Sequence, residues 1–325
     1  MNSLLLNKRA FLQLGGALLA LPGWSQSYPS RVVSLVVPYP AGGGSDFLAR
    51  QLQPELSRQL GQTVIVENTG GVGGAIGVQK VLSAPPDGYQ LVLGSPMELM
   101  LTPLAISAVK YKPEDLVPVA QIMTTTMVLL TRKDLPARNI QELVDAGRKK
   151  ELSYGSVGPG SLYHLVAERF SQLTQLRTLH VPYKGMAPVL TDLMGGQIDM
   201  AFVPLNGNVP HLIQEGQVKA LGVTARAPNA RLPNVEALAA RPGFESLEFD
   251  IWGGIQVPRR TPADVVARLH AAVYESLRNP DIRKAYEGAG NTVPDPMPLA
   301  RLEQLYRAEI GRYQAMAKSV NLQTQ

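Results

Sequence analysis

The first stretch whose residue types could do chemistry is 32–46, with the sequence VVSLVVPYPAGGGSD. Its apolar, β-branched run predicts a buried strand, and the prolines and glycines after it predict a stiff turn. Ser45 and Asp46 then open a segment with helical spacing. The first turn of such a helix has unpaired backbone N–H groups and a positive dipole, and both favour an anion. We therefore expect this loop to hold a carboxylate; a strand-to-helix turn without a ligand is the alternative.

Two further loops carry polar side chains after predicted strands. One is 156–161, SVGPGS, which follows a strand at 152–155 and precedes an apolar helical stripe. Ser161 stands at the expected N-cap of that helix, with His164 three residues later. The other is 180–185, HVPYKG, whose Val-Pro-Tyr repeats that of the first loop. Each half of the chain is therefore expected to offer an equivalent loop.

In the first loop, the polar groups differ in what they are expected to contact. Asp46 would repel a carboxylate, so we expect it to stabilise the first helical turn or to fix the loop. Ser45 and the glycine N–H groups are the better direct donors. Tyr39 could wall the ligand site, with packing in the core as the alternative.

In the other two loops, each polar side chain has a structural alternative to ligand contact. Ser156 and Ser161 could bind a ligand or cap their own helix. His164 could contact the ligand or make a structural hydrogen bond. Lys184 could pair with an anionic ligand or remain solvated, and Tyr183 could wall the site or pack in the core.

Serine catalysis is the competing interpretation of the second loop. A hydrolase would use Ser156 or Ser161 with His164. A nucleophile elbow requires Gly-x-Ser-x-Gly, but Tyr154 stands in the first position. No acid is evident that would orient a Ser161–His164 pair. We predict no catalytic residues.

Metal and cofactor sites are not indicated either. Four scattered histidines and no cysteine give no metal-ligand spacing. A glycine-rich loop follows a predicted strand at 63–67, but a dinucleotide fingerprint starting at Gly71 would need glycine where Ile76 stands. We predict no metal and no cofactor, and expect these glycines to pack closely against a neighbouring element.

The elements that must position the three loops alternate between strand and helix. Leucines recur every four residues from Leu48 to Leu60, which predicts a helix ending at Gly61. A third strand is predicted at 90–93. This alternation indicates an α/β fold with a parallel sheet, whose ligands bind at the carboxyl ends of the strands.

The domain organisation follows from length and from the C-terminal helices. A chain of 325 residues exceeds what one core usually serves. Two amphipathic helices after residue 260 would return the chain to the first lobe, giving crossings near residues 130 and 250. We predict lobe 1 from residues 28–130 and 250–325 and lobe 2 from 131–249. The two crossings would form a hinge, with the ligand cleft between the lobes.

Residues 1–27 predict a secretory signal peptide. Lys8 and Arg9 precede a mostly apolar run, and small residues follow it, so we expect cleavage near Ser27. The mature chain is then periplasmic. Lys8 and Arg9 also account for two of the five excess positive charges. The mild excess that remains suits an anionic small molecule and is too diffuse for nucleic acid.

The sequence closely resembles the solute-binding receptors of the tripartite tricarboxylate transporter system, the Bug family. The motifs in register are YPSRVVSLVVPYPAGGGSDFLAR, LGQTVIVEN, GGAIG, PPDGYQLVLGS, LSYGSVGPGSLYHLVAERF, HVPYKGMAPVLTDLMGGQIDMAF and WGG. The resemblance implies a periplasmic binding protein fold of type II, in which two α/β lobes hold a small carboxylate without catalysis. One departure is Met97-Glu98, where small polar residues are usual.

Carried onto this sequence, the resemblance gives ligand-binding residues in both lobes. They are Tyr39, Ala41, Gly43, Gly44, Ser45, Asp46, Ser156, Gly158, Gly160, Ser161, His164, Tyr183 and Lys184. The implied function is periplasmic capture of a small organic carboxylate for a tripartite tricarboxylate transporter, by a monomer whose partners are the membrane subunits. The alternatives are a hydrolase and a ligand sensor that docks on a sensor-kinase ectodomain.

Overall fold

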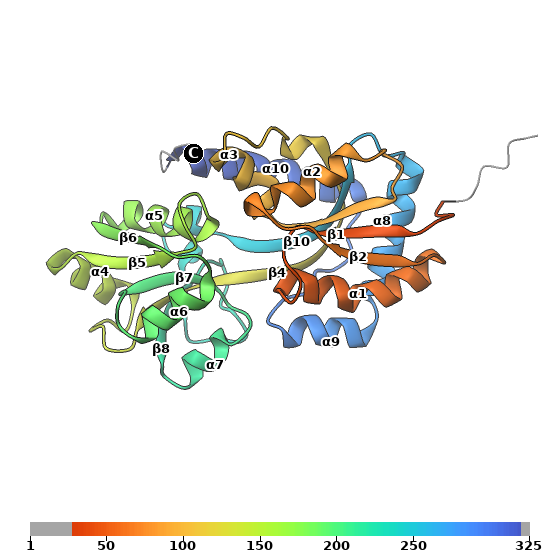
Figure 1. Cartoon of the computed structure of the whole chain (residues 1–325). Helices are drawn as coiled ribbons and strands as arrows, with labels where there is room; N and C mark the ends of the chain where they lie inside the picture. Colours follow the sequence, from red (N-terminus) through yellow and green to blue (C-terminus); the bar gives the residue numbers. More distant parts are fainter. Residues whose placement is uncertain (1–27, 320–325) are drawn as a thin grey trace, which may run out of the picture.

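The structure is a computed structural model that describes residues 28–319. Figure 1 shows two α/β lobes side by side, with strands β4 and β10 running between them. The predicted signal peptide at residues 1–27 lies outside the described residues. Within the described range, no helix is both long enough and apolar enough to cross a membrane.

Lobe 1 contains the N-terminal strands and the C-terminal helices. Its strands are β1 (Val33–Val37), β2 (Val64–Asn68), β3 (Gln90–Gly94), the first part of β4 (Leu116–Arg132) and β10 (Asp250–Pro258). Its helices are α1 (Gly44–Leu60), α2 (Ala75–Ser83), α3 (Thr102–Ala105), α8 (Ala263–Leu277), α9 (Pro280–Gly288) and α10 (Leu299–Ser319), with short turns η1 (Val72–Gly74), η2 (Met97–Leu101) and η3 (Pro113–Asp115).

Lobe 2 is the middle of the chain. Its strands are the second part of β4, β5 (Leu152–Ser156), β6 (Thr178–Pro182), β7 (Met200–Pro204), β8 (Val218–Val223) and β9 (Glu236–Ala237). Its helices are α4 (Ile140–Lys149), α5 (Leu162–Thr174), α6 (Met186–Met194) and α7 (Val209–Gln214), with short turns η4 (Leu238–Ala240) and η5 (Glu245–Leu247).

The strand pairing places the loops of each lobe at one sheet edge. In lobe 1 the order is β2-β1-β3-β10-β4, with β1 parallel to β2 and β3 and with β10 antiparallel to its neighbours. In lobe 2, β5 is parallel to both β6 and β7. The loops after β1, β2 and β3 therefore share one edge, and so do those after β5, β6 and β7.

Strands β4 and β10 carry the chain between the lobes. Residues 116–126 of β4 pair with β10, whereas residues 127–132 pair with β7 and β8. At the change of partner, the Thr126 hydroxyl donates to Asp250 Oδ1 over 2.9 Å. We propose that the hinge lies here, close to the predicted lobe boundaries at residues 130 and 250.

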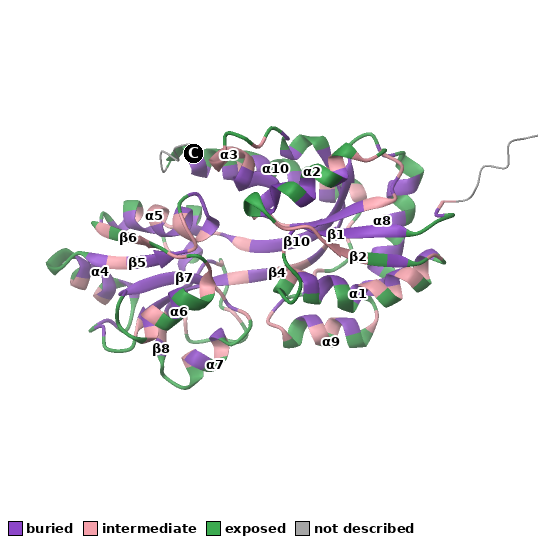
Figure 2. Ribbon diagram, viewed as in Figure 1, coloured by how far each residue is buried: buried purple, intermediate pink, exposed green. Residues whose placement is uncertain are grey.

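Most strand residues near the middle of each sheet are buried, and Figure 2 colours them purple. One core holds lobe 1 together between the sheet and helices α1, α8 and α9. Another includes Tyr306 and Tyr313 of α10 together with Phe170 of α5 and Phe202 of β7. This second core crosses from lobe 1 to lobe 2, so α10 packs against both.

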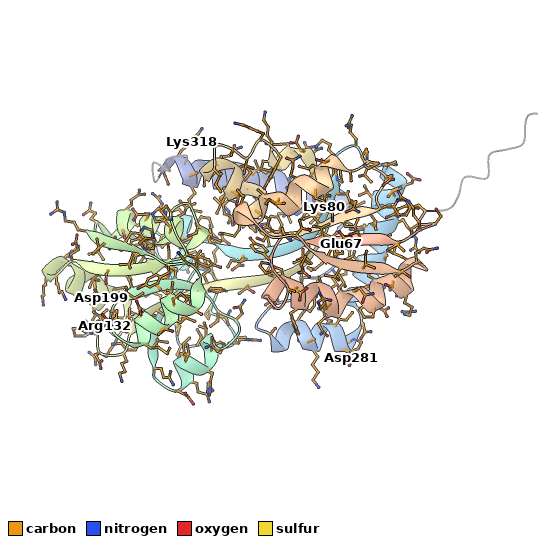
Figure 3. All side chains as sticks on the ribbon, in the orientation of Figure 1. Glu67, Lys80, Arg132, Asp199, Asp281 and Lys318 are labelled. Atoms are coloured by element: carbon orange, nitrogen blue, oxygen red, sulfur yellow. The ribbon has the colours of Figure 1, made fainter. Side chains whose placement is uncertain are left out.

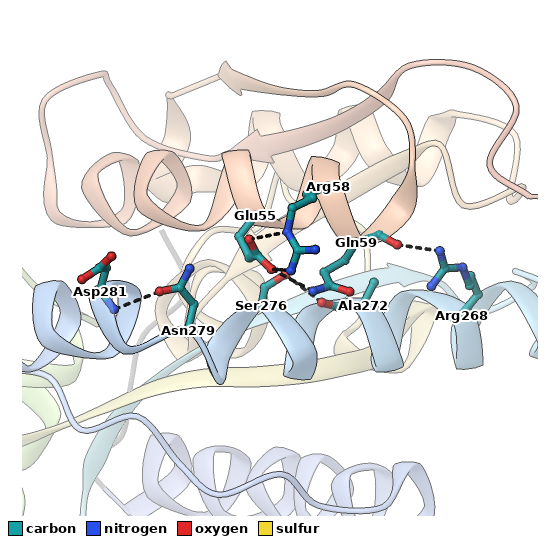
Figure 4. Close-up of polar contacts among 8 residues, drawn as sticks. All are labelled: Glu55, Arg58, Gln59, Arg268, Ala272, Ser276, Asn279 and Asp281. Atoms are coloured by element: carbon teal, nitrogen blue, oxygen red, sulfur yellow. Dashed lines mark hydrogen bonds and ion pairs between the residues drawn. The ribbon is translucent and has the colours of Figure 1, made fainter.

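Polar contacts join neighbouring elements at the surface. Two ion pairs, whose residues are labelled in Figure 3, are Glu67 with Lys80 between β2 and α2, and Arg132 with Asp199 between β4 and the turn before β7. In Figure 4, Arg268 of α8 donates to the carbonyl of Gln59 in α1, over 2.6 Å. These contacts fix the helices on the sheet that positions the loops.

Several predicted elements are confirmed and others were not foreseen. Helix α1 ends before Gly61, whose φ of 69° is the left-handed conformation that favours glycine at this position. Helices α8 and α10 follow the predicted apolar stripes. The 17-residue length of β4 was not predicted, nor was the π-helical turn η2.

Candidate functional site

The loop after β1 presents unpaired donors at the start of α1. Gly43 is the N-cap residue and no side chain caps the helix. The backbone N–H groups of Gly44 and Ser45 and the Ser45 hydroxyl have no hydrogen-bond partner among residues 28–319. Ala41, Gly43 and Gly44 are exposed, and Ser45 is half-buried. These groups can therefore donate to an anion without giving up an existing bond.

Asp46 supports this loop from behind. Its Oδ2 accepts from the Gly42 N–H over 2.9 Å and from Arg50 Nε over 3.0 Å, and the residue is 4% exposed. Hydrogen bonds from Arg50 and then from Gly42 lower the pKa of Asp46 to about 2. The carboxylate is thus ionised and paired with Arg50, and its contacts are those of the predicted structural role.

Tyr39 is held by a buried carboxylate. The Tyr39 hydroxyl donates to Glu98 Oε2 over 2.7 Å, and the Ser95 hydroxyl donates to the same atom over 2.8 Å. Glu98 is 1% exposed, and this burial raises its pKa above the ordinary value. The Tyr39 carbonyl accepts from Asn68 Nδ2 over 3.1 Å. The loops after β1, β2 and β3 are therefore tied together.

The loop after β5 caps helix α5 as predicted. Ser161 is the N-cap, and its hydroxyl accepts from the His164 N–H (3.3 Å) and donates to the Gly158 carbonyl (2.7 Å). The Gly160 N–H donates to His164 Nδ1 over 3.2 Å. His164 Nδ1 is therefore an acceptor, which places the proton of the neutral ring on Nε2.

Ser156 has a partner that sequence reasoning missed. It is fully buried, and its hydroxyl lies 2.7 Å from His180 Nε2 on β6 and accepts from the Gly158 N–H over 3.1 Å. In the parallel pairing of β5 with β6, Tyr154 lies opposite His180 and Ser156 opposite Pro182. The period of two along a strand puts Ser156 and His180 on one face, a signal that the sequence already contained.

His180 lies within an aromatic stack. Its ring centroid is 4.9 Å from that of Tyr154 and 4.4 Å from that of His164. Burial, and then the neighbouring His164, lower the pKa of His180 to about 4, although Glu168 acts in the opposite direction. Burial also lowers the pKa of His164. Both rings are thus neutral at neutral pH, and Glu168 bonds to the Tyr154 hydroxyl at the other end of the stack.

The loop after β6 contains two predicted ligand-binding residues, Tyr183 and Lys184, and they differ in their contacts. The Tyr183 hydroxyl donates to Asp192 Oδ2 over 2.7 Å, and its N–H donates to the Ser156 carbonyl over 2.9 Å. Lys184 is exposed and forms no ion pair within the described part of the chain. The hydroxyl and N–H of Tyr183 are therefore bonded within lobe 2, whereas the Lys184 ammonium can pair with an anion.

A hydrogen bond joins the two groups of loops across the lobes. The N–H of Leu162, the first residue of α5, donates to Met97 Sδ in η2 over 3.4 Å. Met97 belongs to lobe 1 and Leu162 to lobe 2. The structure thus brings the loop after β3 against the start of α5, beside Ser161 and His164.

A hydrolytic site does not emerge from this geometry. The Ser156–His180 distance suits a nucleophile and its base, but the Ser156 side chain is sealed from solvent. Glu168 bonds to Tyr154, and no carboxylate orients the His180 ring in the described hydrogen-bond network. The described residues also contain no cluster of three or more side chains placed to hold a metal ion.

Comparison with known proteins identifies the family of this chain. A family model described as the tripartite tricarboxylate transporter family receptor matches residues 48–322. The chain belongs to this receptor family. It is 30% identical to the protein BugT of Bordetella pertussis, over 84% of this chain and 85% of that protein.

Solved structures of relatives share the fold. MatC of Rhodopseudomonas palustris, solved with bound malate, has 30% identity and a TM-score of 0.74 over 89% of this chain and 99% of its own. A second R. palustris protein, solved with adipate, has 30% identity and a TM-score of 0.78 over 92% of this chain and 100% of its own. The protein therefore has the two-lobed α/β fold of periplasmic binding proteins, and the family is one of solute-binding receptors.

Proposed function

We propose that this protein captures a small organic carboxylate between its two lobes and delivers it to the membrane subunits of a tripartite tricarboxylate transporter. The observation that carries the proposal is the set of unpartnered donors at the start of α1, on the edge of the sheet that faces the start of α5. Relatives solved with malate and with adipate support a carboxylate as the ligand class.

The electrostatics of the loops also favour an anionic ligand. Of the two nearby carboxylates in lobe 1, Asp46 is paired with Arg50 and Glu98 is buried under donated hydrogen bonds. Lys184, which forms no ion pair within residues 28–319, adds a positive charge from lobe 2. In the proposed complex, one carboxylate group accepts from the Ser45 hydroxyl and from the N–H groups of Gly44 and Ser45. Ser161, His164 and Lys184 face it from the other lobe.

Capture would work through differential affinity. A ligand that contacts loops of both lobes binds the closed arrangement more tightly than the open one, and so shifts the population toward it. The membrane subunits would recognise that closed arrangement. The protein acts in the periplasm as a monomer, after export directed by residues 1–27.

Mass spectrometry of molecules that co-purify with the native protein tests this proposal. We expect an organic acid in the denatured extract, stoichiometric with protein and absent from an extract of the Ser45→Ala variant. Recovery of a nucleotide, a sugar or a cationic solute would contradict the carboxylate assignment.

The hydrolase alternative has its own observation, the 2.7 Å contact between Ser156 and His180. It requires turnover of ester substrates that disappears in Ser156→Ala and in Ser161→Ala. We expect no turnover, because the Ser156 hydroxyl is buried. A sensory role on a kinase ectodomain would use the same ligand-bound form, and direct binding of that form to either membrane partner distinguishes it from transport.

A further inference from the structure

The turn after β3 contains two residues that connect the lobes and that the site prediction did not include. Met97 and Glu98 open η2, a single π-helical turn from Met97 to Leu101. π-Helical turns are rare in proteins, and those that occur are often found at functional sites. Their side chains point to different neighbours, Glu98 into lobe 1 and Met97 toward lobe 2.

Glu98 anchors the turn to lobe 1. Its carboxylate accepts from Tyr39 and Ser95, and the Tyr111 hydroxyl donates to its carbonyl. A Cβ on Gly74 would lie 2.6 Å from the Glu98 Cβ, so the loop after β2 also packs directly on this residue. Because Glu98 is 1% exposed, the turn cannot shift without breaking bonds to the other loops.

Met97 projects from the anchored turn onto helix α5. The Leu162 N–H, which belongs to the first turn of α5 and has no intrahelical partner, donates to Met97 Sδ over 3.4 Å. A thioether is a weak acceptor, and a carboxylate is a much stronger one for a donor at a helix start. The methionine therefore occupies a backbone donor that a carboxylate could otherwise use.

We propose that Met97 determines the length of acid that the receptor accepts, and that Glu98 is the positioning residue that holds Met97 and Tyr39 in place. This rests on the proposed function, with one carboxylate of the ligand at Ser45. In the protein as it stands, the Met97 side chain blocks the first N–H of α5. Compact acids fit between the loops, and longer α,ω-dicarboxylates are disfavoured because their far end meets the thioether.

Calorimetry with straight-chain dicarboxylates from succinate to suberate tests the role of Met97. In Met97→Ala we expect the ratio of the Kd of succinate to that of adipate to move about tenfold in favour of adipate, the scale of one or two methylenes in an apolar pocket. Met97→Leu is the matched control, since it keeps the volume and removes the sulfur. Its ratio should stay within about twofold of the wild type.

The outcomes separate the two proposals. A ratio unchanged in Met97→Ala, or the same shift in Met97→Leu, overturns the role of Met97 while leaving the receptor function intact. If neither wild type nor Met97→Ala binds any acid of the series, the carboxylate function fails as well. Binding that appears in Met97→Ala alone supports a blocking side chain.

Glu98 is tested by whether its removal changes the selectivity that Met97 sets. Tyr39→Phe removes one hydrogen bond to Glu98 and should weaken binding of the acids by about fivefold. Glu98→Ala should also shift the succinate-to-adipate ratio toward adipate, because Met97 is no longer held in place. Glu98→Gln retains an acceptor and the side-chain shape, so it should recover both the affinity and the wild-type ratio relative to Glu98→Ala. A wild-type ratio and affinity in Glu98→Ala would overturn the positioning role.

Discussion

At the level of single residues, Ser45 and Asp46 are neighbours in one helical turn with different roles: Asp46 is structural, and Ser45 is a proposed ligand donor. Asp46 is buried and bonded to Gly42 and Arg50, which keeps the loop in shape. Ser45 is partly exposed and has no partner among the described residues. Asp46 is therefore compatible with the proposed carboxylate site, because Arg50 neutralises its charge.

The Ser45→Ala variant should lose affinity without losing stability. Removing one hydrogen bond to a ligand carboxylate costs about 1.5 to 3 kcal/mol, which corresponds to a Kd weaker by at least tenfold. The Tm of the empty protein should be unchanged, because the hydroxyl makes no bond in it. Calorimetry and a thermal melt give the two numbers. A lower Tm of the empty variant would mean that Ser45 caps α1, and Asp46→Ala is the control that should lower it.

His180 should make stability depend on pH. Its pKa is about 4 in the folded protein against 6.5 for an ordinary histidine. Above pH 6.5 the ring is neutral in the folded and unfolded states alike. As the pH falls from 6.5 to 4, His180 becomes protonated in the unfolded chain but stays neutral in the folded protein, so the free energy of unfolding decreases. The decrease ends below pH 4, where His180 is protonated in both states. His164, Glu168 and Tyr154 face the ring and set the size of the effect.

Melting curves of wild type and His180→Asn between pH 7.5 and 4 measure this effect. We expect the advantage in Tm of wild type over the variant to shrink as the pH falls through this window. An advantage that stays constant or grows would contradict a His180 that stays neutral in the folded protein. Comparison of the two proteins at each pH cancels the carboxylates that titrate in the same range.

The sequence could predict Ser161 as an N-cap because that motif is local. It marked Met97-Glu98 only as a departure from the family, and it gave no role to His180. The spacing along β5 and β6 puts Ser156 and His180 on one face, but the pairing register that brings them together joins residues 24 positions apart. Met97 contacts Leu162, which lies in the other lobe, and this contact leaves no mark in the spacing of neighbouring residues.

At the scale of elements, helix α2 supports the first loop by close packing. A Cβ on Gly77 would lie 2.8 Å from the Thr69 carbonyl oxygen and 2.9 Å from Pro38 Cα. The glycines after β2 therefore let α2 approach the chain just after β1. This is the close packing that the sequence predicted for them.

Gly77→Ala should destabilise the protein by about 1 to 3 kcal/mol, the usual cost of overpacking a tight contact. Gly311→Ala is the matched control, because Gly311 also lies in a helix but has no atom within 4 Å of its Cβ position. That substitution should stabilise by up to about 1 kcal/mol, since alanine is the better helix former. Urea denaturation measures both. Equal effects of the two substitutions would show that α2 does not rest on Pro38.

The crossing strands were harder to predict than the helices. The apolar stripes of α8 and α10 repeat over many turns, so their pattern is strong. Strand β4 mixes Pro118 and three threonines at 124–126 with apolar residues, because it changes partners and environments along its length. No single period describes such a strand.

At the scale of the whole molecule, the two lobes are joined unequally. On the face covered by α10, one apolar core continues from lobe 1 into lobe 2. Two hydrogen bonds add to it there, from Arg312 Nη1 to the Glu248 carbonyl over 2.7 Å and from Gln172 Nε2 to the Ser319 carbonyl over 2.8 Å. Leu162 belongs to this same core, and its neighbour Met97 packs against it. We infer that α10 keeps the two lobes together on this face.

The measurement that tests this account most directly is calorimetric titration of the mature protein, stripped of ligand by unfolding and refolding, with malate, succinate, adipate and the diamide of succinate. We expect saturable binding of at least one of the acids with one site per chain, no binding of the diamide, and a Kd at least tenfold weaker in Ser45→Ala. If the protein binds none of the acids, or binds the uncharged diamide as tightly as succinate, then the loop at the start of α1 is not a carboxylate site.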